Sequence, residues 1–193
     1  MATSNIDICA RALVMIGAAP ITSFSDGTTE STVAANLYED TVRDLISRYR
    51  WRFAAGQAQL SRRTDTPDAK WDAAYQLPAD LLLLHDVTVN GNVIEYDRYQ
   101  DMIYCDADEA DLVYADYTFR AVEDLWPPYF TTAVELTLAS IFAYAVANQI
   151  QTADYMEKKA LRQLALGRNI DSQAQTSQRF DLSRFEKARR TIR

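Results

Sequence analysis

Residues 81–89 read LLLLHDVTV, and this stretch decides the fold that we expect for the 193-residue chain. It is rich in Leu and Val, and the turn-forming pair Asn90-Gly91 follows it directly. Three more strand-like runs come after the turn: VIEY at 93–96, MIYC at 102–105 and DLVYADYTF at 111–119. Runs of β-branched and aromatic residues separated by turn residues predict antiparallel strands. We therefore expect an antiparallel β insertion at about residues 81–120.

Helical patterns lie on both sides of this insertion. Four segments have the apolar spacing or the end signals of helices, namely residues 4–17, 30–49, 127–150 and 154–175. Ser4 and Asp7 have capping-box spacing, and Pro127-Pro128 suits the start of a helix. We therefore expect a mainly α fold, an antiparallel helical bundle with a small inserted antiparallel β-sheet or hairpin region. The helical core would span residues 4–60 and 127–176.

Length and composition predict one domain with one hydrophobic core. The chain is 48% hydrophobic and 24% charged, which is ordinary for a folded protein. We expect a single domain at residues 1–176, followed by a basic tail at residues 177–193. The most apolar stretch, residues 130–147, contains Glu135 and many Ala and Thr residues, so it predicts a buried helix and no membrane span. The opening residues have no secretory-signal pattern, and we expect the protein to be made in a cytoplasm.

The charges are segregated along the chain. The net charge is −7, which argues against a general nucleic-acid coat because such binding needs excess Lys and Arg. Between Glu95 and Asp124 there are ten acidic and two basic side chains, whereas residues 177–193 hold six basic and two acidic ones. One interpretation is a solvated acidic hairpin and a solvated tail. The other is a pair of docking surfaces of opposite sign.

The common catalytic and nucleotide-binding patterns are missing from the sequence. The single histidine, His85, precedes Asp86 in a predicted strand, where neighbouring side chains point to opposite faces and cannot form an orienting pair. Cys9 and Cys105 are far apart, so we expect two reduced, packed thiols and no metal site. We expect no enzyme activity and no cofactor. A hydrolase with paired carboxylates stays open, because acidic residues are plentiful.

The segment RYRWRF at residues 48–53 alternates arginines with Tyr49, Trp51 and Phe53. In an extended segment, this alternation would place the guanidiniums on one face and the aromatic rings on the other. Such interleaving can bind single-stranded nucleic acid. The acidic net charge favours a different role, in which the rings belong to the core or a subunit interface and the arginines pair with carboxylates.

The order of these segments resembles the tail tubular protein A family of phage head-to-tail adaptor, or connector, proteins. The resemblance covers nearly the whole chain up to about residue 175. It rests on IDICARALVMIG at 6–17, Pro20-Ile21-Thr22-Ser23, Trp51-x-Phe53-Ala54, Tyr75-x-Leu77-Pro78-x-Asp80, and Pro128 and Phe130 before the Ala-rich helix. None of these motifs is catalytic, so the resemblance depends on their order along the chain.

The resemblance implies a structural virion protein at the head–tail junction, assembled in the host cytoplasm. Subunits of this family form a ring, commonly of twelve copies, between the portal protein and the tail nozzle. DNA passes through such a ring during packaging and ejection without specific binding. Asp106, Asp108 and Asp111 would then face the channel or the neighbouring subunit. Two alternatives remain open, a tail-associated peptidoglycan hydrolase and a cytoplasmic helical scaffold unrelated to phage.

The basic tail is the expected docking element for the portal. Phe180 and Phe185 would act as anchors, and Arg184, Arg189 and Arg190 would pair with an acidic partner surface.

Deleting residues 177–193 should abolish portal binding and leave the helical circular-dichroism signal unchanged. Within the full chain, Phe180→Ala and Phe185→Ala should weaken binding more than any single Arg substitution, because aromatic anchors usually carry more binding energy than rim charges. A truncated protein that binds the portal with unchanged affinity would show that the tail is not the docking element.

Overall fold

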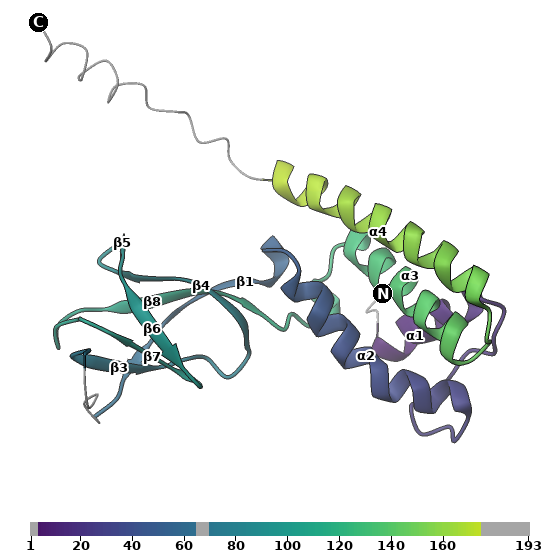
Figure 1. The fold of residues 1–193 in the computed structure, drawn as a ribbon, viewed down its shortest axis with the longest axis horizontal. Helices are drawn as coiled ribbons and strands as arrows, with labels where there is room; N and C mark the ends of the chain where they lie inside the picture. Colours follow the sequence, from purple (N-terminus) through teal and green to yellow (C-terminus); the bar gives the residue numbers. More distant parts are fainter. Residues whose placement is uncertain (1–3, 65–69, 175–193) are drawn as a thin grey trace, which may run out of the picture.

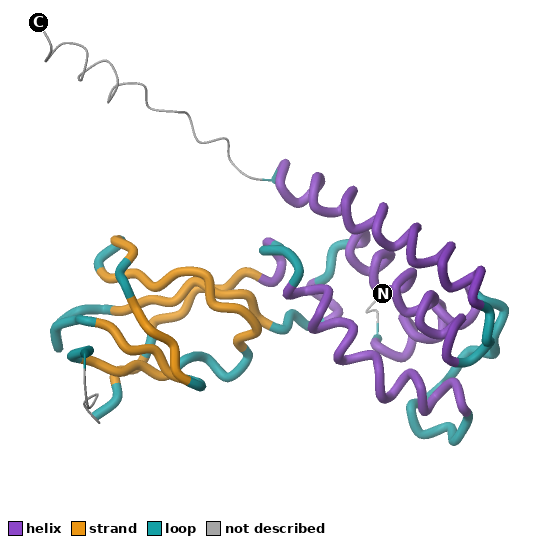
Figure 2. The backbone as a smooth tube through the Cα atoms, in the orientation of Figure 1, coloured by secondary structure: helices purple, strands orange, loops and turns teal. Residues whose placement is uncertain are grey.

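The computed structural model describes residues 4–64 and 70–174, which form an elongated molecule with helices at one end and strands at the other (Figure 1). The helices are α1 (Asn5–Met15), α2 (Thr29–Ser47), α3 (Pro128–Ala145) and α4 (Ile150–Gln173). The strands all lie between α2 and α3 in the sequence. Figure 2 separates the two halves by colour, with purple helices on one side and orange strands on the other.

The expected fold class is wrong. Of the residues that the structure describes, 47% are helical and 22% lie in strands, so this is a mixed α/β protein with two antiparallel four-stranded sheets. Strands begin at Ala55, inside the segment that we expected to be helical core. Residues 55–62 read AGQAQLSR, which lacks the β-branched and aromatic residues typical of strands. Pairing with a strong strand far along the chain, rather than local preference, makes this segment extended.

The first sheet has the strand order β1-β8-β4-β5. Its members are β1 (Ala55–Gln59), β8 (Val113–Phe119), β4 (Leu81–Val89) and β5 (Asn92–Val93). Each neighbouring pair is antiparallel, and Ala55 lies opposite Thr118 in the register. The first and last strands of the insertion are therefore neighbours.

The second sheet has the strand order β2-β3-β7-β6. Its members are β2 (Ser61–Arg62), β3 (Ala73–Gln76), β7 (Met102–Cys105) and β6 (Tyr96–Tyr99), again in antiparallel pairs. The chain passes from one sheet to the other at Leu60, whose N–H donates to the Val113 carbonyl at 2.8 Å. One continuous stretch of chain thus contributes to both sheets.

The two sheets enclose a core of their own. In β7, Ile103 and Cys105 are fully buried while the alternate residues are partly exposed, as expected when one face of a strand is covered. Val87 and Ala115 of the first sheet belong to the same apolar cluster as Ile103 and Tyr75 of the second. The strands therefore form a small sandwich with inward-facing side chains from both sheets.

Helix α3 is the centre of the helical half. It packs against α1, α2 and α4, and its buried residues include Phe130, Val134, Leu138 and Phe142. A helix surrounded by others must be apolar on nearly every side, which accounts for the Ala-rich composition of this segment. All four helices end earlier than expected, and α4 also begins earlier. Asn148 has a φ of 52°, and this left-handed turn separates α3 from α4, so that α4 starts at Ile150 rather than Asp154.

Both connections between the halves pass through short 3₁₀ turns. The turn η1 (Arg52–Ala54) leads from α2 into β1, and η2 (Glu123–Leu125) leads from β8 into α3. We call this region, residues 49–54 and 120–130, the waist. No helix within residues 4–64 and 70–174 has the length and apolar character needed to cross a membrane.

Candidate functional site

Aromatic rings from both connections meet at the waist. Trp51 is fully buried, and its ring lies edge-on to Phe130 with centroids 5.2 Å apart. Phe53 is 4.7 Å from Phe130, and Trp126 is 5.2 Å from the same ring. Tyr49 is partly buried and packs edge-on against Trp51 at 5.0 Å. The structure thus brings Tyr49, Trp51 and Phe53 together against the first turn of α3.

The arginines of the same segment have separate partners. Arg48 forms an ion pair with Asp44 at 2.6 Å, and Arg50 lies 3.6 Å from Asp86 of β4. Arg52 donates to the carbonyl of Ala174 at 3.2 Å. The segment turns through η1 instead of staying extended, so it does not form the expected ladder of alternating faces.

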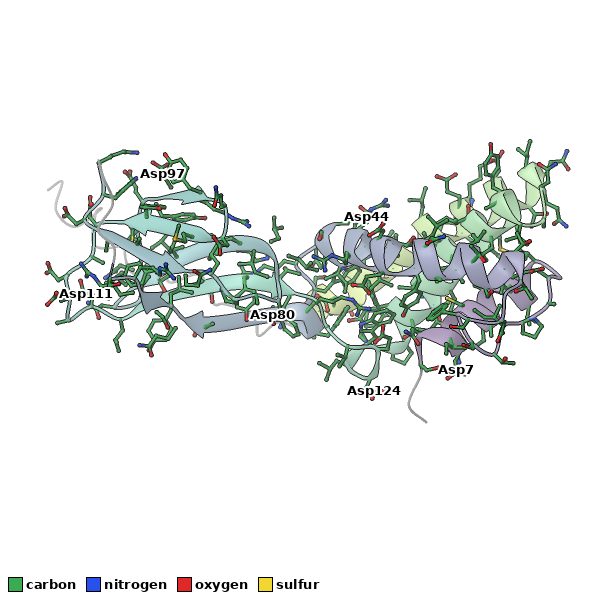
Figure 3. All side chains as sticks on the ribbon, turned by 90° about the horizontal axis from the view of Figure 1, so that it is seen from below. Asp7, Asp44, Asp80, Asp97, Asp111 and Asp124 are labelled. Carbon is green, nitrogen blue, oxygen red and sulfur yellow. The ribbon has the colours of Figure 1, made fainter. Side chains whose placement is uncertain are left out.

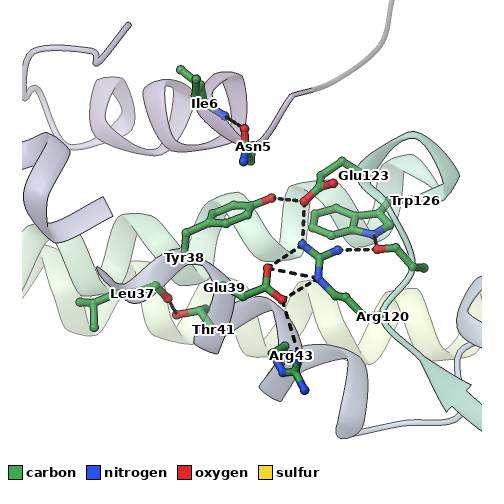
Figure 4. A network of polar contacts seen from close by, with 11 residues as sticks. Asn5, Ile6, Leu37, Tyr38, Glu39, Thr41, Arg43, Arg120, Glu123 and Trp126 are labelled. Atoms are coloured by element: carbon green, nitrogen blue, oxygen red, sulfur yellow. Dashed lines mark hydrogen bonds and ion pairs between the residues drawn. The ribbon is translucent and has the colours of Figure 1, made fainter. Parts of the chain in front are cut away.

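Arg120 joins the two halves through the polar network drawn in Figure 4. Its guanidinium donates to Glu39 of α2 at 3.0 Å and to Glu123 of η2 at 2.7 Å. It also donates to the Ala121 carbonyl and lies over the Trp126 ring, 5.4 Å from the centroid. Burial alone would lower the pKa of Arg120, but hydrogen bonds to Glu39 and Glu123 outweigh it and raise the pKa. The group is a permanent cation.

Glu123 is held as an anion in this network. It accepts a hydrogen bond from the Tyr38 hydroxyl at 2.9 Å, beside the one from Arg120. Burial would raise the pKa of Glu123, yet the hydrogen bonds and the positive charge of Arg120 outweigh it, so the pKa lies below 4.5. Burial, together with the anion of Glu123, raises the pKa of Tyr38, which stays protonated and acts as a donor.

Asp171 fastens the end of α4 to the other side of the waist. It is only 4% exposed and accepts from the Tyr129 hydroxyl at 2.9 Å. Its carboxylate also accepts from the backbone N–H of Arg52, at 3.3 Å. The helices approach closely here, because a Cβ added at Gly167 would lie 3.0 Å from the Tyr129 ring. Asp171 and Gly167 therefore position the chain where it enters the sandwich.

Neither Arg120 nor Asp171 stands out in the sequence, but a third charged residue, Glu135, does. Glu135 is the one charged residue in the apolar segment of α3, and it pairs with Arg11 of α1 at 2.6 Å. Burial raises the pKa of Glu135, and Arg11 opposes that shift. A carboxylate inside an otherwise apolar helix is a signal for an interhelical ion pair. Asp171 offers a weaker signal, since it continues the buried spacing of Leu164 and Gly167.

Asp106, Asp108 and Asp111 lie in one loop, between β7 and β8, at the end of the sandwich. We call this loop, residues 106–112, the acidic tip. Figure 3 shows Asp111 at the end of the molecule that is remote from the helices. Asp106 and Asp108 are exposed and Asp111 is partly exposed. Together with Arg62, Asp72, Ala107 and Glu109 they line an open depression.

The acidic side chains of the tip also shape its backbone. Asp111 accepts from the backbone N–H of Asp108 and from the Asn90 side chain, each at 3.1 Å. Asp106 accepts from the backbone N–H of Asp72 at 3.2 Å. Arg62 donates to the Ala107 carbonyl at 2.9 Å. Charge and loop structure are therefore linked at this surface.

The rest of the acidic stretch is dispersed. Asp97 pairs with Lys70 at 2.7 Å and accepts from the Trp71 indole at 2.9 Å, and these contacts lower its pKa. Asp116 accepts from Gln57 on β1 at 2.9 Å. Glu123 belongs to the waist. The ten acidic residues between Glu95 and Asp124 thus lie in at least three different places: the acidic tip, other parts of the sandwich, and the waist.

His85 and the cysteines have packing roles. His85 Nε2 lies 2.8 Å from the Thr118 hydroxyl, while Asp86 pairs with Arg50 instead. Burial and the charge of Arg50 lower the pKa of His85. Burial raises the pKa of Cys9 to about 12 and that of Cys105 to about 11, so neither thiol ionises readily. In the part of the chain that the structure describes, no group of His, Cys, Asp and Glu residues could hold a metal ion.

The expected portal-docking residues lie outside the described residues. They are Phe180, Arg184, Phe185, Arg189 and Arg190. No family model matches the chain, and a search of curated proteins found no match.

Glu123→Gln should lower the free energy of unfolding by about 1–3 kcal/mol at pH 7, because a charged acceptor of two hydrogen bonds is lost. The folded-state pKa of Glu123 is depressed, so its contribution is present above pH 4.5 and is lost as the pH falls through the folded value. Urea unfolding at several pH values should show the gap between the two proteins narrowing below pH 4.5. Asp124→Asn, at the exposed neighbour, is the control. A gap that stays constant down to the acid limit would contradict this account.

Asp106→Lys, Asp108→Lys and Asp111→Lys together reverse the charge of the tip. The circular-dichroism spectrum should stay that of the folded protein. DNA retention or ejection should be impaired by about tenfold, because a charge-lined surface influences the rate at which a polyanion passes. The matched control replaces the same residues with Asn, which keeps hydrogen-bond acceptors for the loop but removes the charge. Normal particle yield and normal ejection from the Lys variant would show that the acidic tip is only a solvated surface with no role in DNA passage.

Proposed function

We propose that this chain is a structural subunit of a short-tailed phage virion, an adaptor ring between the portal and the tail, and not an enzyme. The observation that supports this proposal most is the position, in the fold, of the motifs that resemble the adaptor family. Trp51 and Phe53 from the first half of the chain pack directly on Phe130 from the second half. Motifs separated by more than seventy residues thus meet in one cluster, which supports reading them as parts of one arrangement.

The two unlike ends of the molecule support an adaptor role. A subunit that joins two different neighbours needs separate contact surfaces, and here a four-helix half and an acidic sandwich tip lie at opposite ends (Figure 1). The waist between them is fixed by the Trp51 cluster, the Arg120 network and the Asp171 contacts. Because these contacts hold the waist together, a displacement at one end of the molecule would move the other end as well.

The charge supports passage of DNA without specific binding. The net charge is −7, and the tip exposes Asp106, Asp108 and Glu109. Like charge keeps a polyanion from adhering to a surface, and salt screens the repulsion beyond about 8 Å at physiological ionic strength. DNA could slide past such a surface without being held.

The two carboxylates bound to Arg120 do not favour the hydrolase alternative. Glu39 and Glu123 approach each other through the shared guanidinium of Arg120, and that contact depresses the pKa of Glu123. A general acid needs a raised pKa, so this pair has the wrong electrostatics for the acid–base chemistry of glycoside cleavage.

Mixing the full chain with the portal of the same phage should convert it from a monomer or weak oligomer into a ring seated on the portal. Templated assembly avoids premature closure, and light scattering and negative-stain images of each component and of the mixture would measure it. A portal from an unrelated phage is the control. Failure to bind the cognate portal would overturn the proposal, and a stable large ring formed alone at low concentration would contradict templated assembly.

A second measurement tests the hydrolase alternative. When the protein is added to purified cell-wall sacculi, the turbidity of the suspension should stay unchanged.

A further inference from the structure

The outer face of α4 is apolar and cationic at once. Tyr155, Leu166 and Ile170 are 57%, 56% and 50% exposed. The helical period places them on one side of α4, together with the cations Lys158, Lys159 and Arg162. The opposite side is the buried one, formed by Ala153, Ala160, Leu164, Gly167 and Asp171. Among the described residues, no other element covers the outer side.

This arrangement differs from ordinary surface hydrophobicity. Single exposed apolar residues are common and need no explanation, but an aligned strip of large side chains beside cations has the composition of an interface with a protein. Lys159 already lies over the Tyr155 ring, 4.8 Å from its centroid, so the cationic and aromatic parts of the strip are contiguous. The partner should offer acidic side chains and some apolar surface.

The outer face of α2 has the complementary character. Helix α2 contains four carboxylates and one cation, Arg43, and a second cation, Arg48, follows at its C-terminal end and pairs with Asp44. The carboxylates are Glu30, Glu39, Asp40 and Asp44, of which Glu30 is partly exposed and the other three are exposed. Leu37, 36% exposed, adds apolar surface. The exposed and partly exposed charges of α4 have the opposite balance, four cations (Lys158, Lys159, Arg162, Arg168) against two carboxylates (Asp154, Glu157).

The two faces lie at the same end of the long molecule but on different sides of it. In Figure 1, α4 runs along the upper side of the helical half and α2 along the lower side, with α3 between them. Figure 3, turned by 90°, has α2 in front and α4 behind. Two different patches on one chain are what a head-to-tail contact between identical copies uses, and such contacts form rings when the rotation between copies closes.

We infer that the outer face of α4 in one copy docks on the acidic face of α2 in the next copy. This inference rests on the ring of the proposed function and names the surfaces that close it. The apolar strip supplies the centre of the contact, and the lysines and Arg162 pair at its edge with Asp40 and with Asp44, which exchanges its ion pair with Arg48 for one across the contact. Because such edge pairs are exposed, the contact is weak alone and sensitive to salt.

Cross-linking tests the contact even when it is short-lived. Asn36 on α2 and Asn169 on α4 are exposed and neutral, so Asn36→Cys and Asn169→Cys leave the charges and the apolar strip intact. With a flexible bismaleimide, the double variant should give a ladder of trimers and longer species, since each copy offers two different thiols. Each single variant should stop at dimers. The native cysteines are buried, so the wild type reports the background.

The matched control moves one thiol off the proposed surfaces. The pair Asn36→Cys and Asn92→Cys uses an exposed position on β5 of the sandwich and should give no ladder. A ladder from this control equal to that of the first pair would overturn the inference, because it would mark non-specific collision.

Charge reversal in the doubly cysteine-substituted chain identifies the pairing. Lys158→Glu, Lys159→Glu and Arg162→Glu together, or Asp40→Lys and Asp44→Lys together, should each reduce the ladder about tenfold, since like charges then face each other. An equal mixture of the two reversed proteins should restore it, because each α4 face meets an α2 face of opposite sign in the other variant. No ladder from the unreversed protein, or no restoration in the mixture, would overturn the inference.

Portal binding by the same proteins separates this inference from the proposed function. A ladder without portal binding would refute the adaptor role and leave the contact between copies in place. Portal binding without a ladder that depends on these charges would refute the α4–α2 contact and leave the adaptor role intact.

Discussion

The burial of Trp51 against Phe130 is the contact on which the rest of the structure depends. The indole is fully buried, donates to the Leu45 carbonyl at 3.1 Å, and touches rings that come from both connections between the halves. Truncation of a buried aromatic residue typically costs about 3–5 kcal/mol, a large share of the stability of a domain of this size. The contact also determines how the two halves are oriented, since it fixes where the chain leaves α2 and where α3 begins. The positions of both sheets relative to the helices follow from it.

Buried and half-buried charges hold the elements together alongside the aromatic contact. Arg120, Glu135 and Asp171 each join two elements that are distant in the sequence, and each has hydrogen-bonding partners that compensate for desolvation. Such groups add little net stability compared with apolar residues of similar size, but a misplaced element would leave them unpaired in an apolar environment. Their arrangement therefore favours one docking of the helices on the sandwich over others. The surface charges, in contrast, are arranged by region: acidic at the tip and on α2, cationic on the outer face of α4.

Much of the helical half could be predicted from the sequence, because its signals are local. Ser4 and Asp7 form the expected capping box, and the proline pair leads into α3. The strands from Leu81 onward were likewise detectable through β-branched residues and the Asn90-Gly91 turn. The expectation of a mainly α bundle failed at residues 55–62, where alanines, glutamines and a glycine become strands only because β8 and β3 lie beside them. Among the candidate residues, the aromatic cluster and the acidic tip come together as groups, whereas Arg120 and Asp171 acquire their roles from partners that no local pattern reveals.

The pairing of β1 with β8 changes how the chain must fold. The helical core is assembled from two pieces separated by the whole sandwich, so without the sandwich its formation would require closing a long, flexible loop. Once β1 and β8 pair, with Ala55 opposite Thr118, the ends of that loop already lie side by side. The entropy cost of closure grows with loop length only while the loop is disordered. A sandwich that forms early would therefore act as a clamp for the helices, and the contacts of high sequence separation at the waist would form at nearly the rate of local ones.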